Sequence, residues 1–115
     1  MKPCISLKNR DEFNLVYQEK NSLANKYLIM YIRKNELNRN RLGLSVSKKV
    51  GNSVIRHRVT RLLRESYRLN SDTIETGYDI VIVARNSILG RSYKEVESAL
   101  LHLLRLHKLL VKESS

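Results

Sequence analysis

Residues 78–84 constrain the fold of this chain more than any other segment. They read Tyr-Asp-Ile-Val-Ile-Val-Ala and contain a run of β-branched residues that begins just after Gly77. A short apolar run of this kind is typical of a strand that is buried on both faces. The chain therefore needs a sheet, together with helices that cover it.

Two further segments predict strands. Residues 27–32 form a continuous apolar run, and residues 42–47 alternate between apolar and small or polar side chains. The polar, asparagine-rich residues 34–41 lie between them and predict a loop. We expect the two strands to form an antiparallel hairpin across this loop.

Amphipathic periodicity predicts three helices, over about 9–20, 53–69 and 91–111. The first begins with Asp11 and Glu12, whose charges suit the amino end of a helix dipole. The element order is α-β-β-α-β-α, within a single domain that spans residues 1–115. A strand, a helix and a strand in succession, over 42–84, suggest a βαβ unit with parallel strands.

The helix over 53–69 is the most informative element, and Asn52 or Ser53 can cap it. At 100° per residue its apolar side chains fall on one side; they are Ile55, Val59, Leu62, Leu63 and Leu69. The opposite side carries a basic stripe that consists of His57, Arg61, Arg64 and Arg68. Two more arginines, Arg56 and Arg58, flank this stripe.

The charge of the chain is concentrated. There are 22 lysines and arginines against 11 acidic residues, which gives a net charge of +11. Residues 33–68 hold eleven basic and two acidic residues, so this window carries +9 of that charge. A concentrated basic zone indicates a polyanionic partner, either nucleic acid or an anionic membrane surface.

Other features of the sequence indicate the cellular compartment of the protein. No apolar run reaches the length of a membrane-spanning helix, and the first residues lack the apolar stretch of a secretion signal. The single cysteine, Cys4, cannot form an internal disulfide, which fits a reducing compartment. We expect a cytoplasmic protein.

No group of residues has the spacing of a catalytic or metal site. The histidines at 57, 102 and 107 lack zinc-ligand spacing, and no glycine-rich phosphate-binding pattern occurs. The acids Asp72, Glu75 and Asp79 are interpreted as a solvated loop. We therefore expect neither catalytic residues nor metal ligands in this chain.

The basic helix favours RNA as the polyanion. Arginine forms paired hydrogen bonds with phosphates and stacks on bases, so an arginine stripe suits RNA better than a lysine run would. The aromatic signature of an RRM and the GxxG loop of a KH domain are both missing. The aromatic residues Phe13, Tyr17 and Tyr31 fit either a core or a base-stacking platform.

Residues 48–68 resemble the family of bacterial ribonuclease P protein components. The family pattern is a lysine, a glycine, a small residue, a valine and Arg-Asn-Arg in this order, with further basic residues at helical spacing. This chain matches it at Lys49, Gly51, Val54 and Arg56-His57-Arg58, with His57 in place of the central asparagine. An imidazole lacks the two-sided hydrogen-bonding pattern of an amide. The similarity extends to residues 7–17, 24–25, 43–47 and 78–85.

The resemblance implies both a fold and a function. The fold is an α/β (α+β) two-layer sandwich with a small mixed sheet and a left-handed βαβ crossover, against the usual right-handed rule. The protein would bind a large catalytic RNA and the 5′ leader of precursor tRNA, and so assist endonucleolytic 5′ maturation of tRNA. The RNA subunit would carry the chemistry and hold most of the Mg²⁺.

The resemblance also implies which residues meet each partner. The surface for the ribonuclease P catalytic RNA comprises Lys48, Lys49, Asn52, Arg56, His57, Arg58, Arg61, Arg64 and Arg68. The cleft for the precursor tRNA leader lies between the first helix and the sheet and is lined by Phe13, Tyr17, Ile29 and Tyr31. Neither a membrane nor DNA is an expected partner.

Three alternatives stay open from the residues alone. A ribosomal or RNA-chaperone protein could use the same basic helix without any role in cleavage, and it would not need Phe13 and Tyr17 to face a cleft. A stand-alone nuclease would cleave RNA with magnesium but without an RNA subunit. DNA binding through the helix is weaker, because nothing in the sequence suggests a dimer with half-site symmetry.

Overall fold

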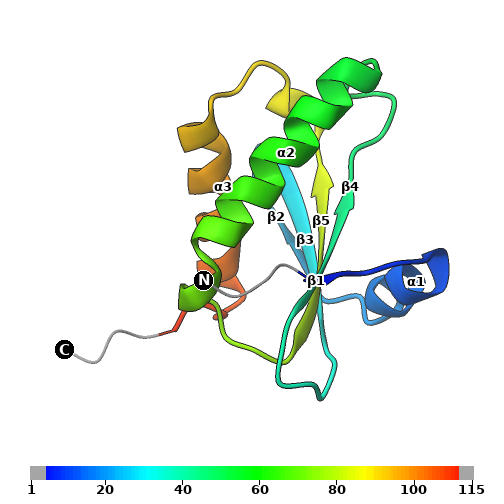
Figure 1. Cartoon of the computed structure of the whole chain (residues 1–115), viewed down its shortest axis with the longest axis vertical. Helices are drawn as coiled ribbons and strands as arrows, with labels where there is room; N and C mark the ends of the chain where they lie inside the picture. The colour runs from blue at the N-terminus through cyan, green and yellow to red at the C-terminus, as the bar shows by residue number, and fades with distance from the viewer. Residues whose placement is uncertain (1–4, 112–115) are drawn as a thin grey trace.

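The structure, a computed structural model, describes residues 5–111. One five-stranded mixed sheet with the order β1-β4-β5-β3-β2 forms its centre (Figure 1). The strands are β1 (Ile5–Ser6), β2 (Ser22–Ala24), β3 (Leu28–Lys34), β4 (Arg41–Ser45) and β5 (Tyr78–Ala84). The helices are α1 (Arg10–Gln18), α2 (Ser53–Leu69) and α3 (Tyr93–Leu106), with short 3₁₀ turns at Ser71–Thr73 and Asn86–Ile88.

The strand β5 lies at the centre of the sheet, as its apolar sequence predicts. It pairs with β3 in antiparallel orientation and with β4 in parallel orientation. The predicted hairpin of β3 and β4 is therefore wrong, because β5 lies between them. A strand that is apolar on both faces is most stable with a neighbour on each side and helices above and below, so it displaces the local pairing.

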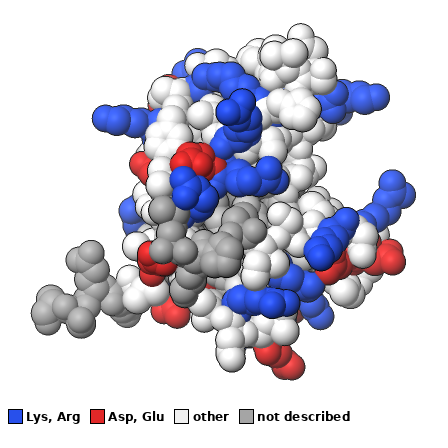
Figure 2. Space-filling model, in the orientation of Figure 1, with Lys and Arg blue, Asp and Glu red and all other residues white. Residues whose placement is uncertain are grey.

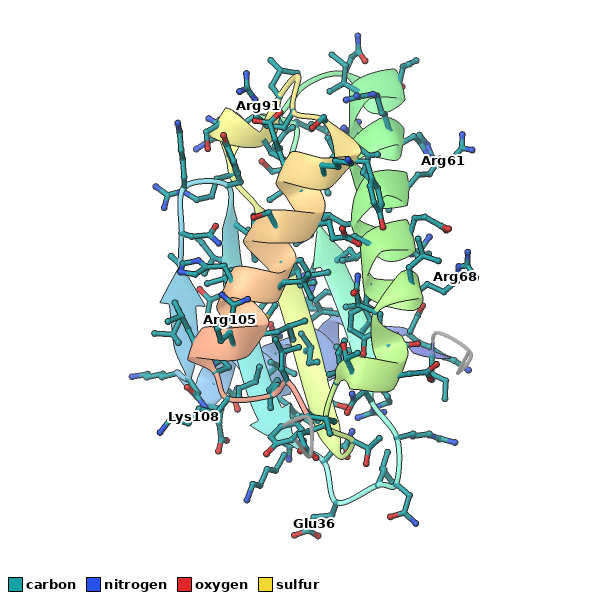
Figure 3. All side chains as sticks on the ribbon, turned by 90° about the vertical axis from the view of Figure 1, so that its left-hand side faces the viewer. Glu36, Arg61, Arg68, Arg91, Arg105 and Lys108 are labelled. Carbon is teal, nitrogen blue, oxygen red and sulfur yellow. The ribbon has the colours of Figure 1, made fainter. Side chains whose placement is uncertain are left out.

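The unit β4–α2–β5 is the predicted βαβ unit with parallel strands. In the view of Figure 3, both strands point upward, α2 lies in front of the sheet, and β5 lies to the left of β4. The crossover is therefore left-handed, against the usual right-handed preference.

The helices α2 and α3 cover one face of the sheet, and α1 lies on the other (Figures 1 and 3). The main core joins alternate residues of β3 and β5 to α2 and α3; its fully buried members include Met30, Ile80, Ile82, Leu63, Leu100 and Leu103. These layers form the predicted mixed sandwich. On the opposite face, Val16 of α1 packs with Val81 and Leu7 in a smaller cluster.

The helix predictions hold within two residues at each end, except that α3 ends at Leu106 rather than at 111. Two further details differ. The edge strands β1 and β2 are only two and three residues long and were not predicted. Leu69, assigned to the apolar side of α2, is the last residue of that helix and is 50% exposed. Cys4 lies outside the described residues.

Asp79 does not belong to a solvated loop. It is the second residue of β5 and only 1% exposed. Its carboxylate accepts hydrogen bonds from Nε and Nη2 of Arg41, at 2.8 and 2.7 Å, and from Nδ2 of Asn35 at 2.8 Å. The interpretation failed because an acidic residue inside a strand is tolerated when basic and amide donors surround it.

Candidate nucleic-acid interface

The outer side of α2 presents the basic stripe that its sequence predicts. The N-cap is Asn52, whose Oδ1 accepts a hydrogen bond from the Ile55 amide at 3.0 Å. Because Val59 and Leu63 are buried against the core, the opposite side chains must face outward. The exposed side chains are His57, Arg61 and Arg64 of the stripe and Arg58 beside it. Figure 2 shows basic side chains spread over the face that α2 occupies.

The segment before α2 extends this surface. Val50 is 2% exposed and its amide donates a hydrogen bond to the Ser47 carbonyl at 3.1 Å, which anchors the turn. Gly51 lies so close to Ile55 that a Cβ at this position would be 2.8 Å from the isoleucine side chain. The anchored turn holds Lys48 and Lys49 exposed beside the beginning of α2.

A groove separates α2 from the end of β4. It has a volume of about 370 Å³ and is lined by Arg56, His57 and Arg64 on one side and by Leu44 and Val46 on the other. Arg56 is half-buried, and its Nε has no hydrogen-bond partner among the described residues. The groove therefore combines a positive wall with an apolar wall.

Arg68 differs from the other arginines of the stripe. Its Nη2 lies 2.5 Å from Oε1 of Glu65, one turn earlier on α2. Hydrogen bonds from Arg68 hold the pKa of the Glu65 carboxyl below its usual value. This ion pair balances much of the charge of Arg68, so this position contributes less to the positive surface than its neighbours.

The basic window of residues 33–68 does not form one surface. Arg41 pairs with Asp79, and Arg33 lies 4.0 Å from the same carboxylate. Lys34 ends β3, and Arg39 lies in the loop that follows it. Glu36 of the same loop lies at the opposite end of the molecule from Arg61 (Figure 3). The candidate interface is therefore α2 with its lead-in, and it is smaller than the window of charge suggests.

The predicted leader residues gather on the other face of the sheet. Phe13 and Tyr17 lie one turn apart on α1, with ring centroids 6.5 Å apart. Tyr17 meets Tyr31 of β3 edge to face, with centroids 4.8 Å apart. Ile29 lies two residues before Tyr31 on the same strand face and is half-buried. Phe13, Tyr17 and Tyr31, which we call the aromatic cluster, are each half-buried and so serve partly as core.

The sheet under the aromatic cluster fits these rings closely. A Cβ on Gly43 would lie 2.7 Å from the Phe13 ring, so only glycine leaves room for it. Burial raises the pKa of the Tyr17 hydroxyl, a hydrogen bond with Ser45 opposes this shift, and the pKa stays above its usual value. Tyr17 therefore stays neutral at physiological pH.

A polar link between α1 and the sheet was not predicted. Nη1 of Arg41 lies 2.7 Å from Oε2 of Glu12 on α1, while the rest of the same guanidinium holds Asp79. Oε1 of Glu12 also accepts a hydrogen bond from the Lys8 amide at 2.6 Å. Arg41 thus positions α1, and with it the aromatic cluster. The sequence contains one indication of this link, because Arg41 and Asp79 lie in the two strands of the predicted βαβ unit.

Comparison with known proteins identifies the family. The sequence model of the Ribonuclease P family matches residues 1–108. The chain belongs to the ribonuclease P protein family. It is 61% identical over 105 residues to the ribonuclease P protein component of Lachnoclostridium phytofermentans, covering 91% of this chain and 90% of the relative. The corresponding protein of Alkaliphilus oremlandii is 56% identical over 105 residues, covering 91% and 92%.

Solved ribonuclease P proteins share the fold. The protein of Staphylococcus aureus, at 30% identity, superposes with a TM-score of 0.86 over 94% of this chain and 99% of its own. That of Thermotoga maritima, at 33% identity, gives 0.82 over 88% and 96%. The family model and the shared fold therefore confirm the resemblance seen in residues 48–68.

Within residues 5–111 no three histidine, cysteine or acidic side chains come together in a way that could hold a metal ion. In the same part of the chain, no helix is both long and apolar enough to cross a membrane.

Proposed function

We propose that this chain is the protein subunit of ribonuclease P that binds the catalytic RNA and the 5′ leader of precursor tRNA. The observation that carries this proposal is the division of the molecule into two different surfaces, within a family already assigned to ribonuclease P. One face presents the arginines of α2, and the opposite face presents the aromatic cluster beside α1.

The surface of α2 would face the catalytic RNA. Exposed guanidinium and ammonium groups along one rigid helix suit the phosphates of a folded RNA, because arginine holds phosphate oxygens with two parallel hydrogen bonds. A phosphate in the groove beside β4 would also give Nε of Arg56 a partner. The proposed contacts are Lys48, Lys49, Asn52, Arg56, His57, Arg58, Arg61, Arg64 and Arg68, of which Arg68 would contribute least.

The aromatic cluster would receive the single-stranded leader. Unpaired bases stack on aromatic rings regardless of sequence, and each stacked base contributes about 1–3 kcal/mol. Phe13 and Tyr17 lie on α1, which Arg41 of β4 ties to the sheet, and Tyr31 lies on β3 of the same sheet. The platform is therefore already formed before a leader binds. Ile29 extends the same strand face as an apolar contact.

The chemistry would belong to the RNA subunit, with this chain as a binding and positioning partner. Magnesium ions held mainly by the RNA would activate the water and stabilise the developing charge. The role of this chain is to hold the leader and the catalytic RNA in one geometry. The cleavage site of the precursor tRNA then stays beside the catalytic RNA, which raises its effective concentration there. Such maturation of precursor tRNA takes place in the cytoplasm.

A second candidate function has one specific observation behind it. A solved mutant of the Staphylococcus aureus protein, with 30% identity and a TM-score of 0.85, is described as defective in mRNA degradation activity. That description belongs to the relative. The same activity can be tested for this chain by incubating the RNA-free protein with an mRNA and Mg²⁺ and measuring whether the mRNA is degraded.

The experiment that tests the proposal is purification of the chain from its native cell, followed by sequencing of the RNA that co-purifies. We expect one predominant large RNA that cleaves precursor tRNA, with little ribosomal RNA. Predominant ribosomal RNA would instead support a ribosomal or chaperone role. A protein that degrades mRNA when no RNA subunit is present would support the second candidate.

A further inference from the structure

The outer side of α2 carries a second, larger hollow, which borders the groove beside β4 and shares His57 and Arg64 with it. It has a volume of about 740 Å³ and is closed on one side by Tyr93, the first residue of α3. Its apolar lining comes from Val54, Leu62 and Tyr93, and Arg58 and Arg61 also line it. None of its apolar residues is among those assigned to RNA binding above.

The apolar part of this hollow is fixed and open to solvent. Val54 is 75% exposed, the highest value among the large exposed hydrophobic residues. The Tyr93 hydroxyl donates a hydrogen bond to Oε2 of Glu97 at 3.0 Å, and the same oxygen accepts one from Nδ2 of Asn70 at 2.9 Å. The ring is thus held in place by the helix ends around it.

The charge around the hollow favours an anionic ligand. Its one acidic lining residue, Glu65, is paired with Arg68. The carboxylate of Glu97 accepts hydrogen bonds from the Tyr93 hydroxyl and from Asn70. Arg58 and Arg61 leave the rim positive.

We propose that this hollow receives a single unpaired base of the catalytic RNA. The base would lie against Tyr93, Leu62 and Val54, and Arg58 and Arg61 would bind its flanking phosphates. Proteins recognise RNA mainly at unstacked bases that contact aromatic rings and arginine side chains. The volume is within the range of small-molecule sites, about 300–1,000 Å³. This inference rests on the proposed function and adds a base-specific contact to it.

The test is chemical probing of the catalytic RNA with dimethyl sulfate and a carbodiimide, which together modify the pairing edges of all four bases. The RNA is saturated with the full chain or with a variant. We expect the wild-type chain to protect one unpaired base or a pair of adjacent ones. Val54→Trp places a large ring over the apolar lining of the hollow and should abolish this protection, with about a tenfold loss of affinity.

Matched variants separate the hollow from the rest of α2. Leu69→Trp adds the same ring to an exposed position of α2 outside the hollow and should keep the protection. Tyr93→Phe retains the ring and should behave like the wild type, whereas Tyr93→Ala should lose the protection. Because Val54 is exposed, its variant gives an answer even if Tyr93→Ala unfolds.

Two outcomes would overturn the inference while leaving the proposed function in place. One is a protection pattern that Val54→Trp leaves unchanged at full saturation. The other is a wild-type chain that binds the catalytic RNA but protects no unpaired base. A wild-type chain that does not bind this RNA at all would contradict the proposed function and the inference together.

Discussion

Arg41 and Asp79 face each other across the parallel pair of β4 and β5 and form a two-point ion pair, with distances of 2.8 and 2.7 Å. The third nitrogen of the same guanidinium lies 2.7 Å from Glu12 of α1. This one side chain therefore joins the centre of the sheet to the helix that carries Phe13 and Tyr17.

We predict that Arg41 acts in stability and positioning rather than in RNA binding. Arg41→Met leaves the buried carboxylate of Asp79 without its main partner, which should lower the free energy of unfolding by about 3 kcal/mol. Urea denaturation measures this. The double variant Arg41→Met with Asp79→Leu should recover most of the loss, because no unpaired charge is left. A double variant less stable than Arg41→Met would contradict this account.

The stability should depend on pH through Asp79. Burial alone would raise the pKa of the Asp79 carboxyl, but hydrogen bonds from Arg41 and Asn35 and the nearby positive charges outweigh it, so the pKa lies below its usual value. The contribution of the ionised form is therefore complete above about pH 5 and is lost as the pH falls through the lowered pKa.

Urea denaturation of the wild type and of Asp79→Asn from pH 7 to pH 3 measures this effect. The difference between the two free energies of unfolding should stay constant down to about pH 5 and shrink at lower pH. A difference that is constant over the whole range would show that the Asp79 carboxyl has the same pKa in the folded and unfolded chain.

Affinity for the catalytic RNA should depend strongly on salt. Five exposed residues of the candidate interface form no ion pair within residues 5–111; they are Lys48, Lys49, Arg58, Arg61 and Arg64. If each neutralises one phosphate, the logarithm of affinity should fall with the logarithm of salt concentration with a slope of about −4. Binding titrations from low to moderate salt give the slope.

A matched pair of double variants shows where this salt dependence arises. Arg58→Gln with Arg61→Gln should reduce the slope by about 2. Lys34→Gln with Arg39→Gln removes the same charge at the opposite end of the molecule and should leave the slope unchanged. Equal effects of the two double variants would mean that net charge alone, and not the face of α2, determines binding.

The leader should be recognised by the aromatic cluster. Tyr17→Ala removes the ring that joins Phe13 to Tyr31, and one stacked base is worth about 1–3 kcal/mol. We expect roughly a tenfold loss of affinity for precursor tRNA with a leader, little change for mature tRNA, and unchanged assembly with the catalytic RNA. Competition binding to the assembled enzyme measures the ratio.

The control for this prediction is Val16→Ala, which changes the buried neighbour of Tyr17 on α1. It should lower stability but preserve the preference for a leader. An equal loss of preference in both variants would mean that the rings act only as core.

The sequence predicts those parts of the fold that local patterns determine. The periodicity of α2 and the apolar run of β5 identify both elements and their buried sides. Local patterns could not predict that β3 and β4 each pair with β5 rather than with each other. The bounds of the strands show that β5 begins 33 residues after β4 ends. Sheet order is decided by which strand buries most apolar surface, and that depends on the whole chain.

The candidate site shows the same division. The stripe of α2 follows from its sequence, because exposure on a helix follows from spacing. The role of Arg41 does not, since charge counting shows it only as one of the eleven basic residues in the window 33–68. Only the register between β4 and β5 brings it beside Asp79. The hollow at Tyr93 likewise depends on how α3 packs against α2.

The measurement that tests the central claim most directly is cleavage of a precursor tRNA at low magnesium by the catalytic RNA alone, by this chain alone and by the two together. Maturation at the correct 5′ end should appear only with both components, and it should weaken when Tyr17→Ala or Arg58→Gln with Arg61→Gln replaces the wild-type chain. Equal cleavage by the RNA with and without this chain, over a range of magnesium concentrations, would contradict the account.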